Sequence, residues 1–145
     1  MIINRREFIA GSVAVSLALP DAFSAPPSGM PSTDSWPAEL DALVAAPHHH
    51  KLLFENDAVR VLDTRIAPGD RTPIHTHRWP SVLHVLSLAP FIRYDASGKV
   101  LLDTRNAPAP ASLPITTWSQ ALPAHSLENV GTMEIHVISV EIKKA

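Results

Sequence analysis

Gly69-Asp70-Arg71-Thr72-Pro73-Ile74-His75-Thr76-His77 is the stretch of the chain that decides the fold. It begins in a turn and continues into a segment whose pattern is typical of a strand. Side chains two residues apart on a strand point to the same face, about 6.6 Å apart along the chain. His75 and His77 could therefore reach one metal ion, each through a bond of about 2 Å.

The composition limits both the size and the chemistry of the protein. The 145 residues allow one domain, and 46% of them are hydrophobic, which is enough to build a core. The formal net charge is −2 and no basic stripe is present, so nucleic acid is not expected as a partner. The chain has no cysteine, which excludes disulfides, thiolate nucleophiles and cysteine-based metal sites. Any bound metal must therefore have nitrogen or oxygen ligands.

The first 24 residues have the pattern of a secretory signal peptide. Arg5 and Arg6 form a charged start, and the apolar run Gly11–Leu19 is too short to span a bilayer. The string Asn4–Ala10 resembles the twin-arginine export signal of bacteria. Cleavage is expected after Ser24, which leaves no stable membrane anchor. These features predict a periplasmic or secreted protein.

The mature chain is expected to begin with a linker and one short helix, over residues 25–50. Ala25–Asp34 is rich in Pro, Ser and Gly, as flexible linkers are. Ser35 is a good N-cap, Pro37 suits a first turn, and Pro47 would end the helix.

Residues 51–145 have the pattern of a β domain. Many prolines separate short apolar runs, which predicts about eight strands and no second helix. An antiparallel barrel or sandwich follows from this count. The expected strands are Lys51–Phe54, Val59–Ile66, Thr72–His77, Ser81–Leu88, Phe91–Tyr94, Val100–Asp103, Ile115–Ser119 and Met133–Ile142.

This layout resembles the cupin superfamily. Gly69, His75 and His77 match the family's first motif in type and spacing, and His125 with Asn129 matches the end of its second motif. The resemblance implies an all-β fold, a cupin-type jelly-roll β-barrel, and one divalent metal held by His75, His77 and His125. It also implies a homodimer.

The chain departs from the family pattern in one ligand. The glutamate of the first motif would fall at Ser81 or Val82, and neither can replace a carboxylate. The resemblance therefore implies a three-histidine centre, with Ser81 beside the ligands and Asn129 orienting His125 through a hydrogen bond.

Three neutral imidazoles leave a metal with its full positive charge and open positions. Some cupins with such a site, including thiol and diketone dioxygenases, bind Fe(II), and a bidentate anionic substrate would supply the missing negative charge. Fe(II) is favoured here, and Zn, Mn, Ni and Cu are the alternatives. The functional hypothesis is an exported metalloenzyme, dioxygenase-like, that acts on a small molecule. The alternative is a non-catalytic cupin that binds a small ligand or a metal.

Other side chains are weaker candidates. Four are placed in the substrate pocket: Trp79, Arg60, Arg93 and Tyr94. An arginine in the barrel would hold a substrate carboxylate, although a surface position is the commoner outcome.

The remaining histidines have non-catalytic interpretations. The run His48-His49-His50 is interpreted as an exposed turn, with adventitious metal binding as the alternative. His84 is placed outside the barrel or at a subunit contact, because it lies three residues beyond Ser81 on one strand. His136 is in phase with Ile138 and Val140 and is interpreted as a core histidine.

The export signal can be tested by a conservative double change. Arg5→Lys with Arg6→Lys keeps the charge and should block delivery to the periplasm, because the twin-arginine signal requires the arginine pair itself. Cell fractionation and immunoblotting measure this. Unchanged delivery would show that the twin-arginine interpretation is wrong.

Overall fold

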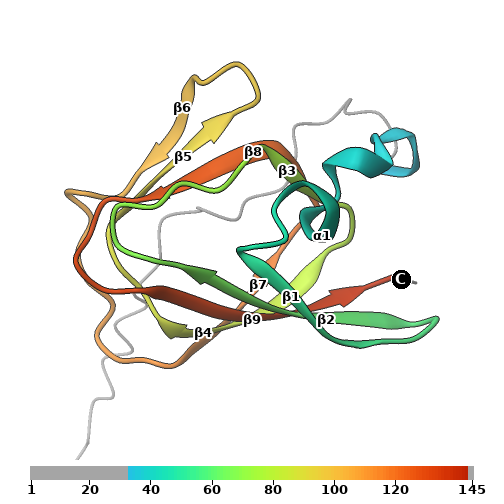
Figure 1. Cartoon of the computed structure of the whole chain (residues 1–145). Coiled ribbons are helices and arrows are strands. Elements are labelled where there is room, and N and C mark those ends of the chain that lie inside the picture. Colours follow the sequence, from blue (N-terminus) through green and yellow to red (C-terminus); the bar gives the residue numbers. More distant parts are fainter. Residues whose placement is uncertain (1–32, 144–145) are drawn as a thin grey trace, which may run out of the picture.

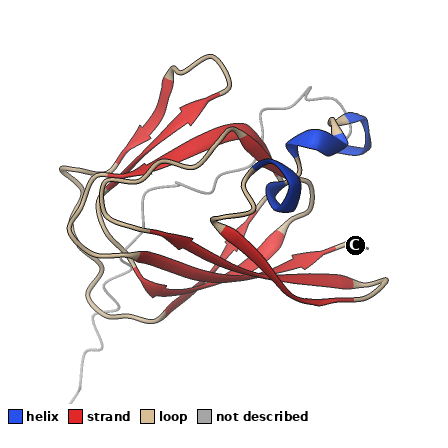
Figure 2. Ribbon diagram, viewed as in Figure 1, coloured by secondary structure: helices blue, strands red, loops and turns tan. Residues whose placement is uncertain are grey.

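The computed structural model describes residues 33–143, which form two antiparallel sheets with very little helix (Figures 1 and 2). The predicted signal peptide and most of the predicted linker lie outside the described residues. Three short helical elements come first: η1 (Thr33–Ser35), η2 (Ala38–Leu40) and α1 (Ala42–Ala45). The strands are β1 (His50–Glu55), β2 (Val59–Ile66), β3 (His75–His77), β4 (Ser81–Ser87), β5 (Phe91–Asp95), β6 (Val100–Asp103), β7 (Ile115–Ser119), β8 (Leu122–Asn129) and β9 (Ile135–Ile142).

The two sheets are the layers of a jelly roll. One has the strand order β1-β2-β9-β4-β7 and the other β3-β8-β5-β6. Two neighbouring pairs, β1-β2 and β5-β6, are consecutive in sequence, and the other neighbouring strands are distant in sequence. The helical elements lie together at one end of the layers (Figure 2). The predicted all-β jelly-roll class is confirmed.

Alternation of side chains along the strands explains the layers. In β2, Arg60, Leu62 and Ile66 are buried, and these residues are an even number of positions apart. A period of two places them all on the inner face. A core cluster of Ile66, Phe91 and Ile135, with Ala89, closes one end of the interior.

Most strands lie where the sequence predicts them. The bounds of β2, β6 and β7 agree with the predicted ranges, whereas β3 is shorter than predicted. Strand β8 was not predicted, because Pro123 suggests a break. The structure accommodates Pro123 near the start of the strand, where a missing N–H is tolerated.

The predicted short helix is interrupted. Pro37 has no N–H to donate, and Asp41 has an extended backbone (φ −55°, ψ 140°) between η2 and α1. Asp41 instead caps α1, since its side chain accepts a hydrogen bond from the Leu43 N–H at 3.0 Å. The result is three short turns in place of one helix.

Gly69 allows the chain to turn before the histidine pair. Its φ of +78° lies in the left-handed region, where a side chain would be strained. Its N–H donates to the Asn129 carbonyl at 2.9 Å, which ties the turn to the end of β8. The motif glycine therefore sets the entry of the chain into β3.

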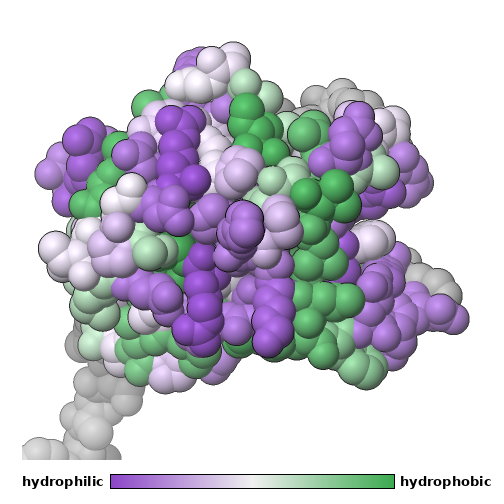
Figure 3. All heavy atoms as spheres, viewed as in Figure 1, coloured by the Kyte–Doolittle hydropathy of each residue, from purple (hydrophilic) through white to green (hydrophobic). Residues whose placement is uncertain are grey.

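Some apolar side chains remain on the surface. Hydrophobic residues gather over α1 and β1 in the view of Figure 3, and Val44, Leu52, Leu53 and Phe54 are exposed there. Strand β1 is the edge of its sheet. Among residues 33–143, no helix has the length and apolar character that crossing a membrane requires.

Candidate metal centre

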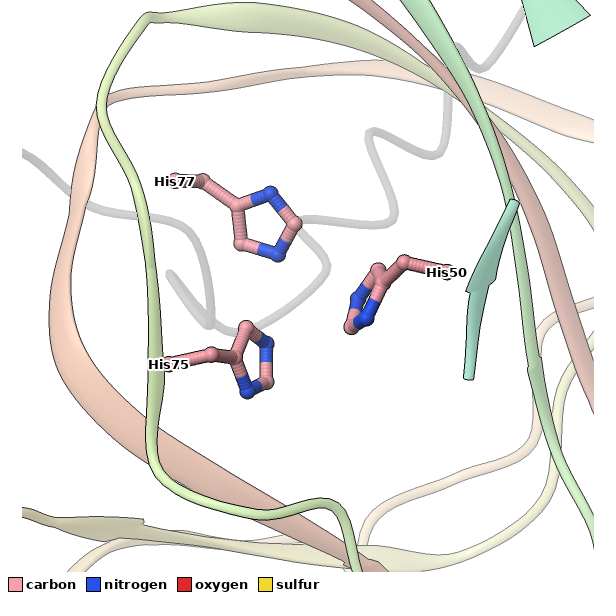
Figure 4. Close-up of side chains that lie close together, drawn as sticks. All are labelled: His50, His75 and His77. Carbon is pink, nitrogen blue, oxygen red and sulfur yellow. The ribbon is translucent and has the colours of Figure 1, made fainter. Parts of the chain in front are cut away.

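Four histidines meet inside the barrel. His50 comes from β1, His75 and His77 from β3, and His125 from β8. The first three each offer a ligand atom, and these atoms all lie within 4.8 Å of one another. Figure 4 shows their rings turned toward a common space from two sides. This spacing fits three nitrogen ligands of one ion.

His125 lies beside this group of three. Its Cα pairs with that of His75 across β3 and β8, and the two ring centroids are 4.5 Å apart. Its centroid is 5.9 Å from that of His77. The structure thus places His125 next to His75 and His77, as predicted, but the group whose ligand atoms all lie within 4.8 Å of one another contains His50 in place of His125.

Each of the four rings has its Nδ1 atom at a hydrogen-bonding distance from an oxygen. The acceptors are Ala46 O for His50 (3.2 Å), Pro73 O for His75 (2.8 Å), Glu141 Oε1 for His77 (2.9 Å) and Pro123 O for His125 (2.8 Å). A carbonyl or carboxylate oxygen can only accept, so Nδ1 carries the hydrogen in each neutral ring. The Nε2 lone pair is then free to bind a metal, an arrangement typical of metal-ligating histidines.

Two of these rings share a local sequence pattern. Pro73-Ile74-His75 and Pro123-Ala124-His125 both place the histidine two residues after a proline whose carbonyl it contacts. The same Pro-x-His spacing therefore orients both rings. This pattern is visible in the sequence and could have strengthened the assignment of both residues.

His50 is oriented by the end of α1. Ala46 is the C-cap of that helix, and its carbonyl accepts from both the backbone N–H and the ring of His50. Contrary to the predicted exposed turn, His50 is only 4% exposed. In the same run, His49 instead turns away and contacts Asp70, with 2.9 Å between Nε2 and Oδ2. The sequence offered no signal that separates His50 from its neighbours.

A buried carboxylate stands behind His77. Glu141 is fully buried on β9, and its Cα pairs with that of Ser81 on β4. Ser81, at the position of the family's glutamate, thus lies directly opposite a glutamate on the next strand. Glu141 Oε1 accepts from His77 and does not join the group of candidate ligands.

Arg60 balances the charge of Glu141. Its Nε donates to Glu141 Oε2 at 2.5 Å and its Nη1 to Asp41 at 2.9 Å. Its guanidinium also lies 4.8 Å from the ring centroid of Trp79. Burial alone would raise the pKa of Glu141, but the hydrogen bonds that His77 and Arg60 donate to it, together with the charge of Arg60, hold it below its usual value. Glu141 is therefore an ionised acceptor.

Burial keeps His50, His75 and His125 neutral. Desolvation first, and neighbouring histidines second, lower the pKa of His50 to about 2 and that of His75 to about 3. The pKa of His125 also falls well below its usual value, first because it is buried and then because of His75 and His77. Neutral imidazoles are the form that binds a metal.

The histidines open onto a cavity of about 100 Å³ inside the barrel. Its walls are mainly aliphatic, with buried serines near the histidines. Ser81 is one of these serines. The Ser139 hydroxyl is also buried there and has no hydrogen-bond partner among the described residues.

The four residues predicted for the substrate pocket are not among those that line this cavity. Arg60 contacts Glu141, and Trp79 lies against Arg60. Tyr94 faces outward, where its hydroxyl donates to Glu128 at 2.7 Å and Arg71 covers its ring at 3.9 Å. Arg93 is partly buried, and its desolvation lowers its pKa.

Asn129 has a structural role in place of the predicted contact with His125. It is fully buried, and its Nδ2 donates to the carbonyls of Ile66 and Met133. Its Oδ1 accepts from the Gly131 N–H. Asn129 thus holds the turn between β8 and β9, while Pro123 orients His125.

The two other predicted histidine environments can also be located. His84 is hydrogen-bonded to Thr116 at 2.9 Å on the outer face, in the predicted orientation. His136 faces away from the interior and lies 2.8 Å from Asp63, in place of the predicted core position. Its strand is in the opposite phase, with Ile135 and Ser139 buried.

The depressed histidine pKa values predict how the stability of the metal-free protein depends on pH. Below pH 6.5 the unfolded chain binds protons at these histidines and the folded chain does not, so acid favours unfolding. The free energy of unfolding should be flat from pH 8 to 7 and then fall toward pH 5, by about 1.4 kcal/mol per pH unit for each histidine that stays neutral. Urea titrations at several pH values measure this. His75→Gln should flatten the fall and His84→Gln should not; equal slopes in all three proteins would contradict the assignment.

The buried carboxylate can be tested by Glu141→Gln. This change removes the charge that partners Arg60 and weakens the acceptor of His77. We expect a loss of stability of about 3–5 kcal/mol and a 10- to 100-fold weaker metal affinity. Glu134→Gln, which breaks the exposed pair with Arg65, is the matched control and should cost less than about 1 kcal/mol. Equal effects of the two changes would refute the role of Glu141.

Comparisons with known proteins bear on the fold. No protein-family model matches the chain, and no curated protein matches it. Among solved structures, a cupin domain from Bordetella pertussis Tohama I is 19% identical, with 66% of this chain and 92% of that chain covered and a TM-score of 0.50.

Two further solved structures are similar. A protein with a double-stranded β-helix domain from Klebsiella pneumoniae is 17% identical over 80% of this chain and 90% of that chain, with a TM-score of 0.46. An RmlC-like cupin from Methanocaldococcus jannaschii is 9% identical over 64% and 77%, with a TM-score of 0.45. Together with the two antiparallel sheets, the match to the Bordetella domain shows that this chain has the cupin fold.

Proposed function

We propose that this protein is an exported metal-binding cupin that acts as a mononuclear non-haem metalloenzyme, dioxygenase-like, on a small molecule. One observation carries the proposal. His50, His75 and His77 offer ligand atoms within 4.8 Å of one another, and each ring is held by an acceptor at Nδ1. A histidine with a purely structural role in the core needs only a hydrogen-bond partner. By contrast, three rings whose free nitrogens converge on one point fit a metal ion.

The donor set bears on which metal is bound. Imidazole nitrogens suit Fe, Zn, Cu and Ni, and the described site offers no carboxylate as a direct ligand. Fe(II) is favoured because an open, histidine-only face leaves room for a chelating substrate. Fe(II) would supply redox chemistry with O₂ when bound. Neutral ligands leave its charge uncompensated, which favours a substrate with an anionic head.

The protein's own residues would hold the histidine rings in place and exclude water from the bound substrate. Ala46, Pro73 and Glu141 fix the rings of the three converging histidines. The aliphatic cavity would keep solvent from the bound substrate. Of the three residues that fix the rings, Ala46 and Glu141 are buried, and Pro73 lies at the surface.

A non-catalytic ligand- or metal-binding cupin is the second candidate. The observation that favours it is the cavity lining, which offers no acid or base besides the histidines among the described residues. Any reaction would then depend on the metal alone. Oxygen consumption separates this candidate from the enzyme.

The proposal includes a homodimer in the bacterial periplasm. Leu52, Leu53 and Phe54 are exposed on the edge strand β1, and burying them against a second copy would remove apolar surface from water. The leader-like sequence of the first 24 residues supports export.

Metal analysis of protein purified without a histidine tag tests the proposal. We expect about one metal ion per chain, and its loss in both His50→Ala and His75→Ala, because each change removes one of the converging ligands. His84→Ala is the matched control and should keep the metal. Absence of stoichiometric metal, or its full retention in His75→Ala, would contradict the metal site.

Oxygen uptake then tests catalysis. Metal-loaded protein should consume O₂ with small thiols or β-diketones, and the His84→Ala control should do so equally. A loaded protein that consumes none with either class would favour the non-catalytic candidate.

A further inference from the structure

The interior of the barrel changes from polar to apolar along β9. Its inward side chains, in order from the metal centre, are Glu141, Ser139, Val137 and Ile135. Alternate side chains on a strand are about 6.6 Å apart, so these positions form successive layers. The layer of Glu141 contacts His77, and the layer of Ile135 belongs to the hydrophobic core.

Neighbouring strands extend the deeper layers. Val137 pairs with Val85 on β4 and with Thr64 on β2, and Ile135 pairs with Ile66 on β2. Phe91 packs in the same cluster as Ile66 and Ile135. Apart from Thr64, these side chains at the end of the cavity away from the metal centre are aliphatic or aromatic, so this end favours hydrocarbon.

Ser139 occupies the layer between the two ends. It pairs with Leu62 on one side and Leu83 on the other, and it is 4% exposed. Its hydroxyl has no hydrogen-bond partner among the described residues. Because buried hydroxyls are normally satisfied, this group is suited to bond a ligand about one layer from the metal.

Charge and size further limit the ligand. Among the described residues that line the cavity there is no Asp, Glu, Lys or Arg. A second charge on the ligand would be buried without a partner, at a large cost. The volume of about 100 Å³ is somewhat smaller than the cavity of about 150 Å³ that binds benzene in an engineered protein.

We infer that the substrate is a small chelator with a single anionic head at the metal and an uncharged, mainly hydrocarbon tail of about four carbon atoms. A hydrogen-bonding group near the middle of the tail would contact the Ser139 hydroxyl. The tail would end against Val137, Ile135 and Phe91. This inference rests on the proposed metal site and adds the chemical class of its ligand.

A series of hydroxamates that share the metal-binding head and differ in chain length tests the inferred length of the tail. Acetohydroxamate, butanohydroxamate, hexanohydroxamate and octanohydroxamate are titrated by calorimetry into the Zn(II)-loaded full chain. Affinity should rise roughly fourfold for each added methylene up to about five carbons, the hydroxamate carbon included, and then stop rising. A carboxylate at the end of the hexanohydroxamate chain should weaken binding at least about 100-fold. Affinity that is independent of length, or unaffected by the terminal carboxylate, would overturn the inference.

Variants locate the tail in the barrel. Val137→Phe should fill the deep layers and remove the dependence on chain length while acetohydroxamate still binds. Ile138→Phe, on the outer face of the same strand, is the matched control and should change nothing. If Val137→Phe does not fold, Val137→Ala should move the optimum to a chain one or two carbons longer. An unchanged optimum would place the tail elsewhere.

The central hydroxyl has its own test. A 4-oxohexanohydroxamate should bind the wild-type protein at least as well as hexanohydroxamate, and roughly tenfold more weakly in Ser139→Ala. Equal binding to both proteins would remove Ser139 from the inference.

Metal content measured before each titration separates the two proposals. A chain that retains no Zn(II) contradicts the metal centre itself. A chain that holds Zn(II) but binds every hydroxamate equally contradicts the ligand class alone.

Discussion

The hydrogen bond at Nδ1 is the interaction on which the rest of this site depends. Four rings in the barrel each have Nδ1 within 3.2 Å of an oxygen, three of them backbone carbonyls and one the Glu141 carboxylate. These acceptors fix the tautomer and the direction of each ring. Without them the buried rings would be free to turn, and their Nε2 atoms would have no common target. Short local features supply the three carbonyl acceptors: a helix end and two Pro-x-His turns.

The buried carboxylate links the metal centre to the frame of the barrel. Glu141 connects His77 to Arg60, and Arg60 reaches Asp41 at the start of α1. The same helix ends at Ala46, which orients His50. One polar network thus spans both sides of the site. A carboxylate thus stands beside the candidate site on β9, opposite Ser81 of β4, and supports one of the candidate ligands.

The fold and three of the four histidines of the site could be predicted from the sequence because they rest on local patterns. The alternation of side chains along the chain predicts the bounds of β2, and the His-x-His spacing places His75 and His77 on one face of a strand. His50 could not be predicted, since three adjacent histidines leave open which one points inward. Glu141 was missed for a related reason: its partner Arg60 is 81 residues away, and their pairing depends on strand register. The Pro-x-His pattern at His125 was visible but was not used.

The central claim is that these four rings carry their hydrogen on Nδ1 and leave Nε2 free. Long-range ¹H–¹⁵N correlation spectra of the metal-free protein at pH 7, with ring signals assigned through single His→Gln variants, measure the tautomers directly. The account predicts the Nδ1–H form for His50, His75, His77 and His125, with Nε2 shifts that move when Zn(II) is added. Protonated rings, or Nε2–H tautomers at His50 and His75, would contradict it.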